Sequence, residues 1–234
     1  NGRCPPGHPG LDKKYDIIVS QPSHPWTAGA SHLYTKEFMQ LADQHLTESG
    51  VFLQWMNIDF IDRRLFKSLC NTLLNVFKYV RVYEWQPNVM FFIGSNQPLQ
   101  IEQNIADTGA PFKDNQAHFM NKGMASLEDI LAGLVMDEEG IQRFARGAAV
   151  ITDDFNLMAT GSKMTRTAGN SMSRFEIADL YVEYSPIFEP ESWVYNDLSY
   201  DVNFSYIAKR YHINSIAMLE EKLIETMQEM NHPG

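Results

Sequence analysis

The chain has 234 residues, a length that suits one large domain or one domain with an appendage. Hydrophobic residues make up 44% and charged residues 21%, a globular composition that excludes a disordered chain. The net charge of −10 repels phosphate backbones and so disfavours nucleic-acid partners. Its apolar runs are far shorter than the ~20 residues of a membrane span, so no membrane contact is expected.

The cysteine content and the first residue bear on location and on completeness. Cys4 and Cys70 are too few for a disulfide framework or a zinc site, which fits a reducing, cytoplasmic location. The seven histidines show no metal-ligand spacing, so we expect no metal. Since the chain opens on Asn1 with no visible leader, we expect it to be a piece of a longer protein.

The first elements predict an α/β arrangement. Tyr15–Ser20 is a continuous apolar run, typical of a parallel strand buried on both faces. After a loop rich in proline and glycine, Thr35 can cap a helix that ends near Ser49-Gly50. Val51–Met56 then predicts a second buried strand.

The next segment predicts a helix followed by a pair of strands. Asp59 suits the N-cap of this helix, with Asp62 in its first turn. Tyr79–Glu84 and Val89–Gly94 follow as two strands joined by a short turn. Strands alternating with helices and closed by adjacent strands indicate an α/β layer that ends in an antiparallel hairpin.

The second half predicts helices separated by loops. Residues 99–125 read as a loop, and a capping box at Ser126–Asp129 predicts a helix through Met136. A further helix is expected over Glu139–Arg146, and Gly161–Ser173 reads as a mobile loop. Near the end, an apolar stripe predicts a helix that docks on the core or binds a partner: Ile216, Leu219, Leu223, Met227 and Met230.

Two motif blocks carry a resemblance to a known family. Residues 15–56 read YDIIVSQPSHPWTAGASHLYTKEFMQLADQHLTESGVFLQWM. This string resembles the spermidine synthase (polyamine aminopropyltransferase) family, especially spermidine synthase-like domains of larger bacterial proteins. Leu127–Leu131, Gly140 and Val150–Asp154 are similar to the closing segment of that family. The resemblance covers roughly residues 1–158.

The resemblance implies a partial Rossmann-like sheet of the class I S-adenosylmethionine-dependent methyltransferase type. Tyr15–Ser20 would be its fourth strand and Val51–Met56 its fifth, and the hairpin would close the sheet at strands six and seven. Residues 1–98 would form the C-terminal half of that domain, 99–160 a family-like helical and loop extension, and 161–234 an unmatched helical tail. The Gly-rich loop and the acidic ribose-binding residue would precede Asn1, so this piece is expected to be inactive alone.

The resemblance also implies a set of site residues. Asn1, Gly2 and Ser20 would contact S-adenosylmethionine or its decarboxylated form. Gln21 stands where the family has its catalytic carboxylate, and an amide cannot accept a proton. His24 stands at a second acidic position, and an imidazole can accept a proton near neutral pH. The alternative for His24 is a structural role in its Pro-rich loop.

The acceptor, a small amine or another nucleophile, would meet residues at the strand ends. These are Ser23, Trp26, Gln54, Trp55 and Trp85. Aromatic faces favour cations, although the same tryptophans can simply fill the space between loop and sheet. Asp153 and Asp154 permit a metal or acid–base role, although paired acids on a loop are usually solvated or cap a helix.

Three functions remain open on the sequence. The first is a spermidine synthase-like transferase, and the second a non-catalytic interaction or ligand-binding domain that has lost its base. The third is a methyltransferase with another acceptor. Because Ile17, Ile18 and Val19 would form an apolar sheet edge, we also expect a homo-oligomer, through this edge or the C-terminal helix. The resemblance allows a membrane tether in the complete protein, as in some relatives.

Overall fold

The computed structural model describes residues 13–22, 24–27, 29–86, 88–109 and 112–212. Their strands form one five-stranded mixed sheet, in the order β1 (Tyr15–Ser20), β2 (Leu46–Asn57), β4 (Val89–Ser95), β3 (Tyr79–Gln86) and β5 (Leu134–Met136). The chain divides into two compact units. The first runs to Val80 and includes Phe91–Leu99 and Ala145–Ser171, and the second holds Arg81–Met90, Gln100–Phe144 and the residues from Met172 on.

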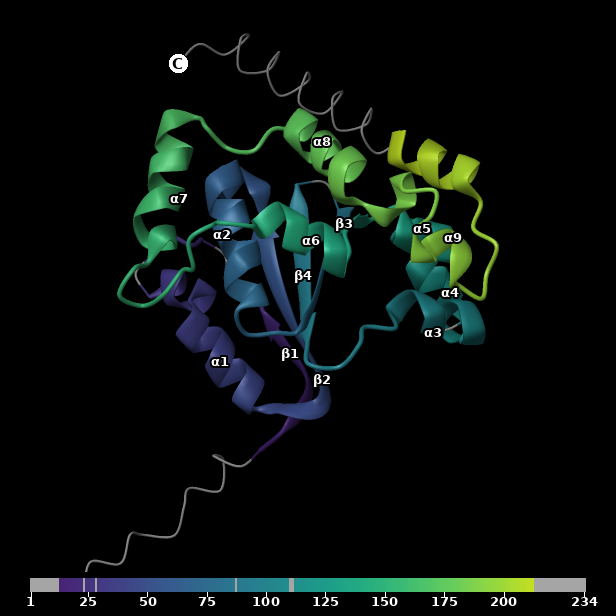
Figure 1. Cartoon of the computed structure of the whole chain (residues 1–234), viewed down its shortest axis with the longest axis horizontal. Helices are drawn as coiled ribbons and strands as arrows, with labels where there is room; N and C mark the ends of the chain where they lie inside the picture. The colour runs from purple at the N-terminus through teal and green to yellow at the C-terminus, as the bar shows by residue number, and fades with distance from the viewer. Residues whose placement is uncertain (1–12, 23, 28, 87, 110–111, 213–234) are drawn as a thin grey trace, which may run out of the picture. The chain divides into compact units, whose positions relative to one another are not determined.

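The first unit contains the parallel pair that the sequence predicts. Strand β1 (Tyr15–Ser20) has the predicted bounds and pairs in parallel with β2 (Leu46–Asn57), but it is not buried on both faces as predicted, since Ile17 is 65% and Val19 59% exposed. Strand β4 (Val89–Ser95) follows β2 in the sheet. Helix α1 (Lys36–Gln44) contacts β2 and helix α2 (Arg63–Leu74), and α2 contacts helix α7 (Leu157–Ala168) (Figure 1).

The predicted end of the first helix, near Ser49-Gly50, is wrong. Helix α1 is capped by Thr35 as expected, whose hydroxyl accepts from the Phe38 amide, but it ends at Gln44. Leu46 pairs with Tyr15, and the Tyr15 amide donates to the His45 carbonyl at 2.8 Å. Leu46 and the residues after it therefore pair with β1 as a strand, although their apolar spacing also suits a helix.

The predicted start of the second helix is corrected by one turn. Helix α2 (Arg63–Leu74) has Asp62 as its N-cap, whose carboxylate accepts from the Leu65 amide at 2.8 Å. Asp59 lies instead in the short 3-10 helix η2 (Ile58–Phe60), which Asn57 caps. Cys70 is buried on the apolar side of α2, and this burial raises the pKa of its thiol.

The hairpin is present and carries an additional strand. Strand β3 (Tyr79–Gln86) is joined to β4 by two residues, and only antiparallel strands can be joined so tightly. At the predicted capping box the Asp129 carboxylate accepts from the Ser126 amide at 3.1 Å, but helix α5 (Leu127–Leu131) stops well before Met136. Residues Leu134–Met136 form β5, which pairs antiparallel with β3, and the carbonyl of the preceding Gly133 accepts from the Glu84 amide.

Two segments predicted as loops are helical. Residues 99–125 contain α3 (Ile101–Thr108) and α4 (Phe112–Met120), and the predicted mobile loop is largely α7 (Leu157–Ala168). Helix α6 (Glu138–Ala145) lies close to its expected range. The remaining helices are η1 (Ala30–Tyr34), α8 (Arg174–Tyr184), η3 (Pro186–Phe188) and α9 (Trp193–Asn196).

Buried polar residues explain why helices α3 and α7 are not predicted from the spacing of apolar residues. In α3, Glu102 is fully buried, and in α7, Ser162 and Thr165 are buried.

The apolar stripe predicted from Ile216 to Met230 lies outside the described residues. Among the described helices, none combines the length and the apolar character that crossing a membrane requires.

Candidate functional site

The carboxyl ends of β1 and β2 form the candidate site in the first unit. The two strands are parallel, with Ser20 opposite Gln54, so their chain exits lie at the same edge of the sheet. Ligands of open α/β sheets bind outside the carboxyl ends of the strands. The loop that begins at Gln21 and the helix η2 leave the sheet at this edge and supply the side chains described next.

Four ring side chains cluster on these two chain exits. The His24 ring lies 5.1 Å from that of Trp26 and 5.6 Å from that of Phe60. Trp26 meets Phe60 edge to face at 5.1 Å, and Trp55 meets Phe60 at 6.2 Å. The structure thus brings together three residues that the sequence singles out, and adds Phe60. Its place five residues beyond Trp55, at the exit of β2, is the sequence signal that could have revealed it.

Gln54 holds a buried polar atom that has no protein partner. Its side chain is fully buried, and its Nε2 donates to the Ser20 carbonyl at 3.3 Å and to the Trp55 carbonyl at 3.1 Å. Because both of these groups are acceptors, the amide nitrogen must face them, which fixes the orientation of the amide. Gln54 Oε1 is then left without a hydrogen-bond partner among the described residues. An ordered water or the donor group of a ligand would satisfy this oxygen, and because its accessible surface is below 1 Å², a ligand reaches it only when neighbouring side chains move.

Of the other predicted site residues, Ser20 and Gln21 lie at the end of β1 beside Gln54, and the rest lie elsewhere or outside the described residues. Ser20 is buried at the end of β1, and Gln21 is exposed. Trp85 lies in the second unit, where it stacks on Tyr83 at 4.7 Å and its Nε1 donates to the Ile130 carbonyl. Asn1, Gly2 and Ser23 lie outside the described residues.

A histidine–aspartate pair in the first unit was missed by the sequence reasoning. His32 Nδ1 lies 3.0 Å from Asp153 Oδ1, and the Asp153 amide donates to Glu37 Oε2 at 3.0 Å. Both side chains of the pair are about half exposed. The residues are 121 positions apart, so no local pattern could have joined them. Asp153, for which a solvated or helix-capping role was the usual expectation, thus forms a hydrogen bond with His32.

The hydrogen bond from His32 lowers the pKa of the Asp153 carboxyl below its ordinary value. The pair therefore stabilises the fold above the unfolded-state pKa of the acid, and loses this effect as the pH falls through the folded-state pKa. We expect His32→Ala to raise the pKa of Asp153, as measured by carbon-detected NMR titration of the carboxyl. His45→Ala, which removes another histidine of the same unit, should leave it unchanged. An unaltered Asp153 titration in His32→Ala would contradict the assignment.

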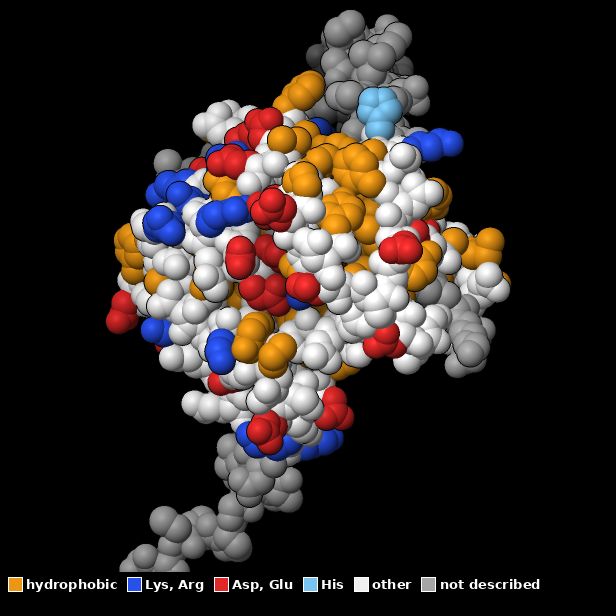
Figure 2. All heavy atoms as spheres, turned by 45° about the vertical axis from the view of Figure 1, so that its right-hand side comes forward, with side chains coloured by type: hydrophobic (Ala, Val, Ile, Leu, Met, Phe, Trp, Pro, Cys, Tyr) orange, Lys and Arg blue, Asp and Glu red, His pale blue; other side chains and the backbone are white. Residues whose placement is uncertain are grey.

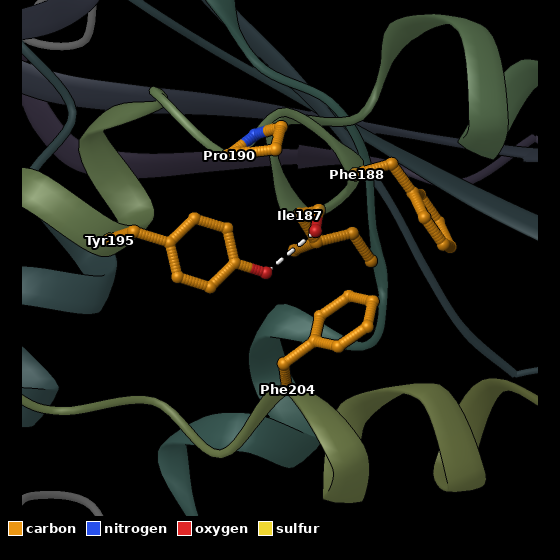
Figure 3. A pocket seen from close by; sticks show the side chains of 5 residues that line it. All are labelled: Ile187, Phe188, Pro190, Tyr195 and Phe204. Atoms are coloured by element: carbon orange, nitrogen blue, oxygen red, sulfur yellow. Dashed lines mark hydrogen bonds between the residues drawn. The ribbon is translucent and has the colours of Figure 1, made fainter.

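A separate apolar pocket lies in the second unit. It has a volume of about 420 Å³ and is lined by Ile187, Phe188, Pro190, Tyr195 and Phe204 (Figure 3). Its phenol, Tyr195, donates to the Ile187 carbonyl at 2.6 Å, so this polar group is already engaged. The lining offers apolar and aromatic surface but no acid, base or nucleophile, so we assign no chemistry to it.

Comparisons with known proteins bear on the family that this chain resembles. Thermospermine synthase ACAULIS5 of Arabidopsis thaliana is 36% identical over 76 residues. The chain resembles the polyamine synthases. The matched stretch takes in 31% of this chain and only 22% of that relative.

A solved structure adds a more distant likeness. A probable spermidine synthase from Corynebacterium glutamicum aligns with a TM-score of 0.38 and 19% identity, over 61% of this chain and 50% of its own. No protein-family model matches the chain. The chain therefore spans a limited part of the proteins that it resembles.

Proposed function

We propose that this chain carries the amine-binding side of a spermidine synthase-like α/β domain. The observation that supports this most directly is Gln54 Oε1, a buried acceptor without a partner at the exit of β2. An amine or ammonium group donates the hydrogen bond that this oxygen lacks. The adjacent rings of His24, Trp26, Trp55 and Phe60 suit the same ligand, because aromatic faces attract cations.

The strand order supports the same assignment. Strands β1 and β2 would be the fourth and fifth strands of a class I methyltransferase-like sheet. The position of β4 between β2 and β3 fits a closing antiparallel pair that folds back into the sheet. The acceptor loop would then be the one that leaves β1 at Gln21.

Aminopropyl transfer requires a neutral amine and a group that takes its proton. Decarboxylated S-adenosylmethionine, when bound, supplies the aminopropyl group, and Ser20, with Asn1 and Gly2, would hold it. The acceptor nitrogen forms a bond to the aminopropyl carbon, whose bond to sulfur breaks with its electron pair left on sulfur. Gln54 Oε1 would orient the nitrogen, and His24 would take the proton that it releases.

Gln21 favours a second function in which the site binds an amine without transfer. The resemblance places a catalytic carboxylate at this position, and the amide of Gln21 cannot accept a proton. His24 is then the group in the ring cluster that can act as a base. A domain that binds and does not react would keep Gln54 and the rings while losing the carboxylate.

Titration with putrescine and spermidine tests amine binding directly. We expect saturable binding by calorimetry, and a dissociation constant raised at least about tenfold in Gln54→Leu, since the variant loses the acceptor. Trp26→Ala should weaken binding as well. Gln40→Leu, which makes the same replacement at an exposed position of α1, should bind as the parent does. Absence of saturable binding, or an unchanged affinity in a folded Gln54→Leu, would refute the proposal.

A second experiment separates transfer from binding alone. Gln21→Asp restores a carboxylate at the exit of β1, and aminopropyl transfer is measured with decarboxylated S-adenosylmethionine and the amine that binds. A rise in transfer supports a transferase site that lacks its base. Unchanged transfer, with amine binding intact, supports the binding function.

A further inference from the structure

The apolar pocket of the second unit is walled by three aromatic rings. The Phe204 ring meets the Phe188 ring at a centroid distance of 6.3 Å and an interplanar angle of 89°. It meets the Tyr195 ring at 6.4 Å and 64°. Ile187 is 1% exposed and lies between the rings, where it forms the floor of the pocket (Figure 3). Aromatic side chains grouped in this way are the kind of cage that recognises quaternary ammonium groups.

The side chains of the lining offer almost no hydrogen bonding. Their single polar atom is the Tyr195 hydroxyl, which donates to the Ile187 carbonyl at 2.6 Å. A primary ammonium carries three N–H donors, and burying these donors without acceptors costs free energy. A quaternary ammonium carries no N–H group, so its burial leaves no donor unpaired. The lining therefore favours a fully alkylated cation over a primary amine.

The chain segment that builds the walls is acidic. Residues 185–208 contain four acidic residues and no lysine, arginine or histidine. Of the four, Glu189 is paired with Arg143 Nη2 at 2.5 Å. The other three have no ion pair among the described residues: Glu191, Asp197 and Asp201.

These three acids act on the pocket because each lies within three positions of a lining residue. That separation is comparable to the range of charge interactions at physiological ionic strength. Figure 2 brings forward the side of Figure 1 that carries α9, and it shows hydrophobic side chains gathered at the surface with acidic side chains beside them. The charge around the pocket thus favours a cation over a neutral or anionic ligand.

We propose that this pocket binds a small molecule that carries a quaternary ammonium group. Its volume of about 420 Å³ lies within the range of small-molecule sites. The ring faces attract the cation, Ile187 and Pro190 contact its alkyl groups, and the acids raise the local concentration of cations. The pocket is distinct from the amine site at Gln54, which lies in the first unit and offers an acceptor that a quaternary ammonium cannot use.

Choline and the neutral alcohol in which carbon replaces its nitrogen separate the effect of charge from that of shape. NMR titration of the Ile187 methyl groups reports binding at the floor of the pocket. We expect saturable shifts with choline and a dissociation constant at least about fivefold higher for the neutral alcohol, since only choline interacts with the rings as a cation. Equal affinities for the two compounds, or no saturable shift with choline, would overturn the proposal.

Phe204→Leu tests the role of the rings. Leucine keeps apolar bulk but removes the ring that meets both of the others, so choline should bind at least about fivefold more weakly. Phe175→Leu is the matched control, because Phe175 is 70% exposed in α8 of the same unit and does not line the pocket. This control should bind choline as the parent chain does. A folded Phe204→Leu with the parent's affinity contradicts the proposal, and neither result bears on the amine-binding test at Gln54.

Discussion

Replacing Glu102 with alanine is expected to lower the free energy of unfolding by about 3–5 kcal/mol, the cost of breaking a buried ion pair. Glu102 is fully buried in α3 and accepts hydrogen bonds from Arg81 Nη1 and from the Tyr83 hydroxyl. Arg81 is 7% exposed, and its guanidinium lies over the Trp193 ring at 4.8 Å. In the variant, the buried guanidinium of Arg81 loses a carboxylate partner, and the buried hydroxyl of Tyr83 loses its hydrogen-bond acceptor.

Urea denaturation followed by circular dichroism measures this effect. Arg81 keeps Glu138, whose carboxylate accepts from its Nε at 2.9 Å, so the loss should fall toward the lower end of the range. Glu102→Gln retains an acceptor of similar size and should lose less than Glu102→Ala. Asn104→Ala, at an exposed position of the same helix, should stay within about 0.5 kcal/mol of the parent. A loss below about 1 kcal/mol in Glu102→Ala would show that this buried charge is not supported by Arg81.

The ion pair between Arg81 and Glu102 also explains why α3 was not predicted from the sequence. Glu102 reads as a solvent-facing residue, because a lone charged side chain is almost never fully buried unless it is paired. Its partner Arg81 lies on a strand 21 positions earlier, and the pairing exists only in the folded unit. Helix α7 was missed for a related reason. Its buried Ser162 and Thr165 donate hydrogen bonds to the Met158 carbonyl and the Asp62 carboxylate, but in the sequence these polar residues resemble a loop.

Elements whose stability is local or simply apolar were predicted well. Strand β1 is a continuous apolar run, and the cap at Thr35 and the capping box at Ser126 depend on neighbours within three residues. Boundaries that depend on tertiary pairing were not predicted. Helix α1 gives way to β2 at Leu46 because that residue pairs with Tyr15, 31 positions earlier in the chain (46 − 15 = 31).

The candidate site divides along the same line. His24, Trp26 and Trp55 were predicted from their places at strand ends, where the topology of parallel strands brings chain exits together. The orphan oxygen of Gln54 could not be predicted, because it follows from two carbonyl acceptors that only the folded chain brings to its amide nitrogen. Residue types at the strand ends predicted where the site lies, whereas only the hydrogen-bond geometry showed that Gln54 Oε1 lacks a partner there.

Replacing Gly140 with alanine is expected to destabilise the second unit by about 3 kcal/mol, the cost of overpacking against a rigid neighbour. Within a helix this substitution ordinarily stabilises by roughly 1 kcal/mol, so the expected sign is the reverse of the usual one. Gly140 lies in α6, and a Cβ there would fall well inside van der Waals contact with the backbone carbonyl oxygen of Tyr184, the last residue of α8. A backbone atom cannot rotate away as a side chain can, so α6 and the end of α8 would have to separate.

Gly161→Ala offers the matched comparison, because Gly161 also lies inside a helix, α7, and is buried. There a Cβ would meet the methyl carbons of Leu65 at 2.9 and 3.1 Å, the movable end of a flexible side chain. We expect this variant to stay within about 1 kcal/mol of the parent, since a small rotation of Leu65 offsets the crowding and the helix gains propensity. Urea denaturation of the two variants decides the matter. Equal stability would show that α6 and the end of α8 do not approach as closely as the Gly140 contact requires, and that helix propensity alone governs both sites.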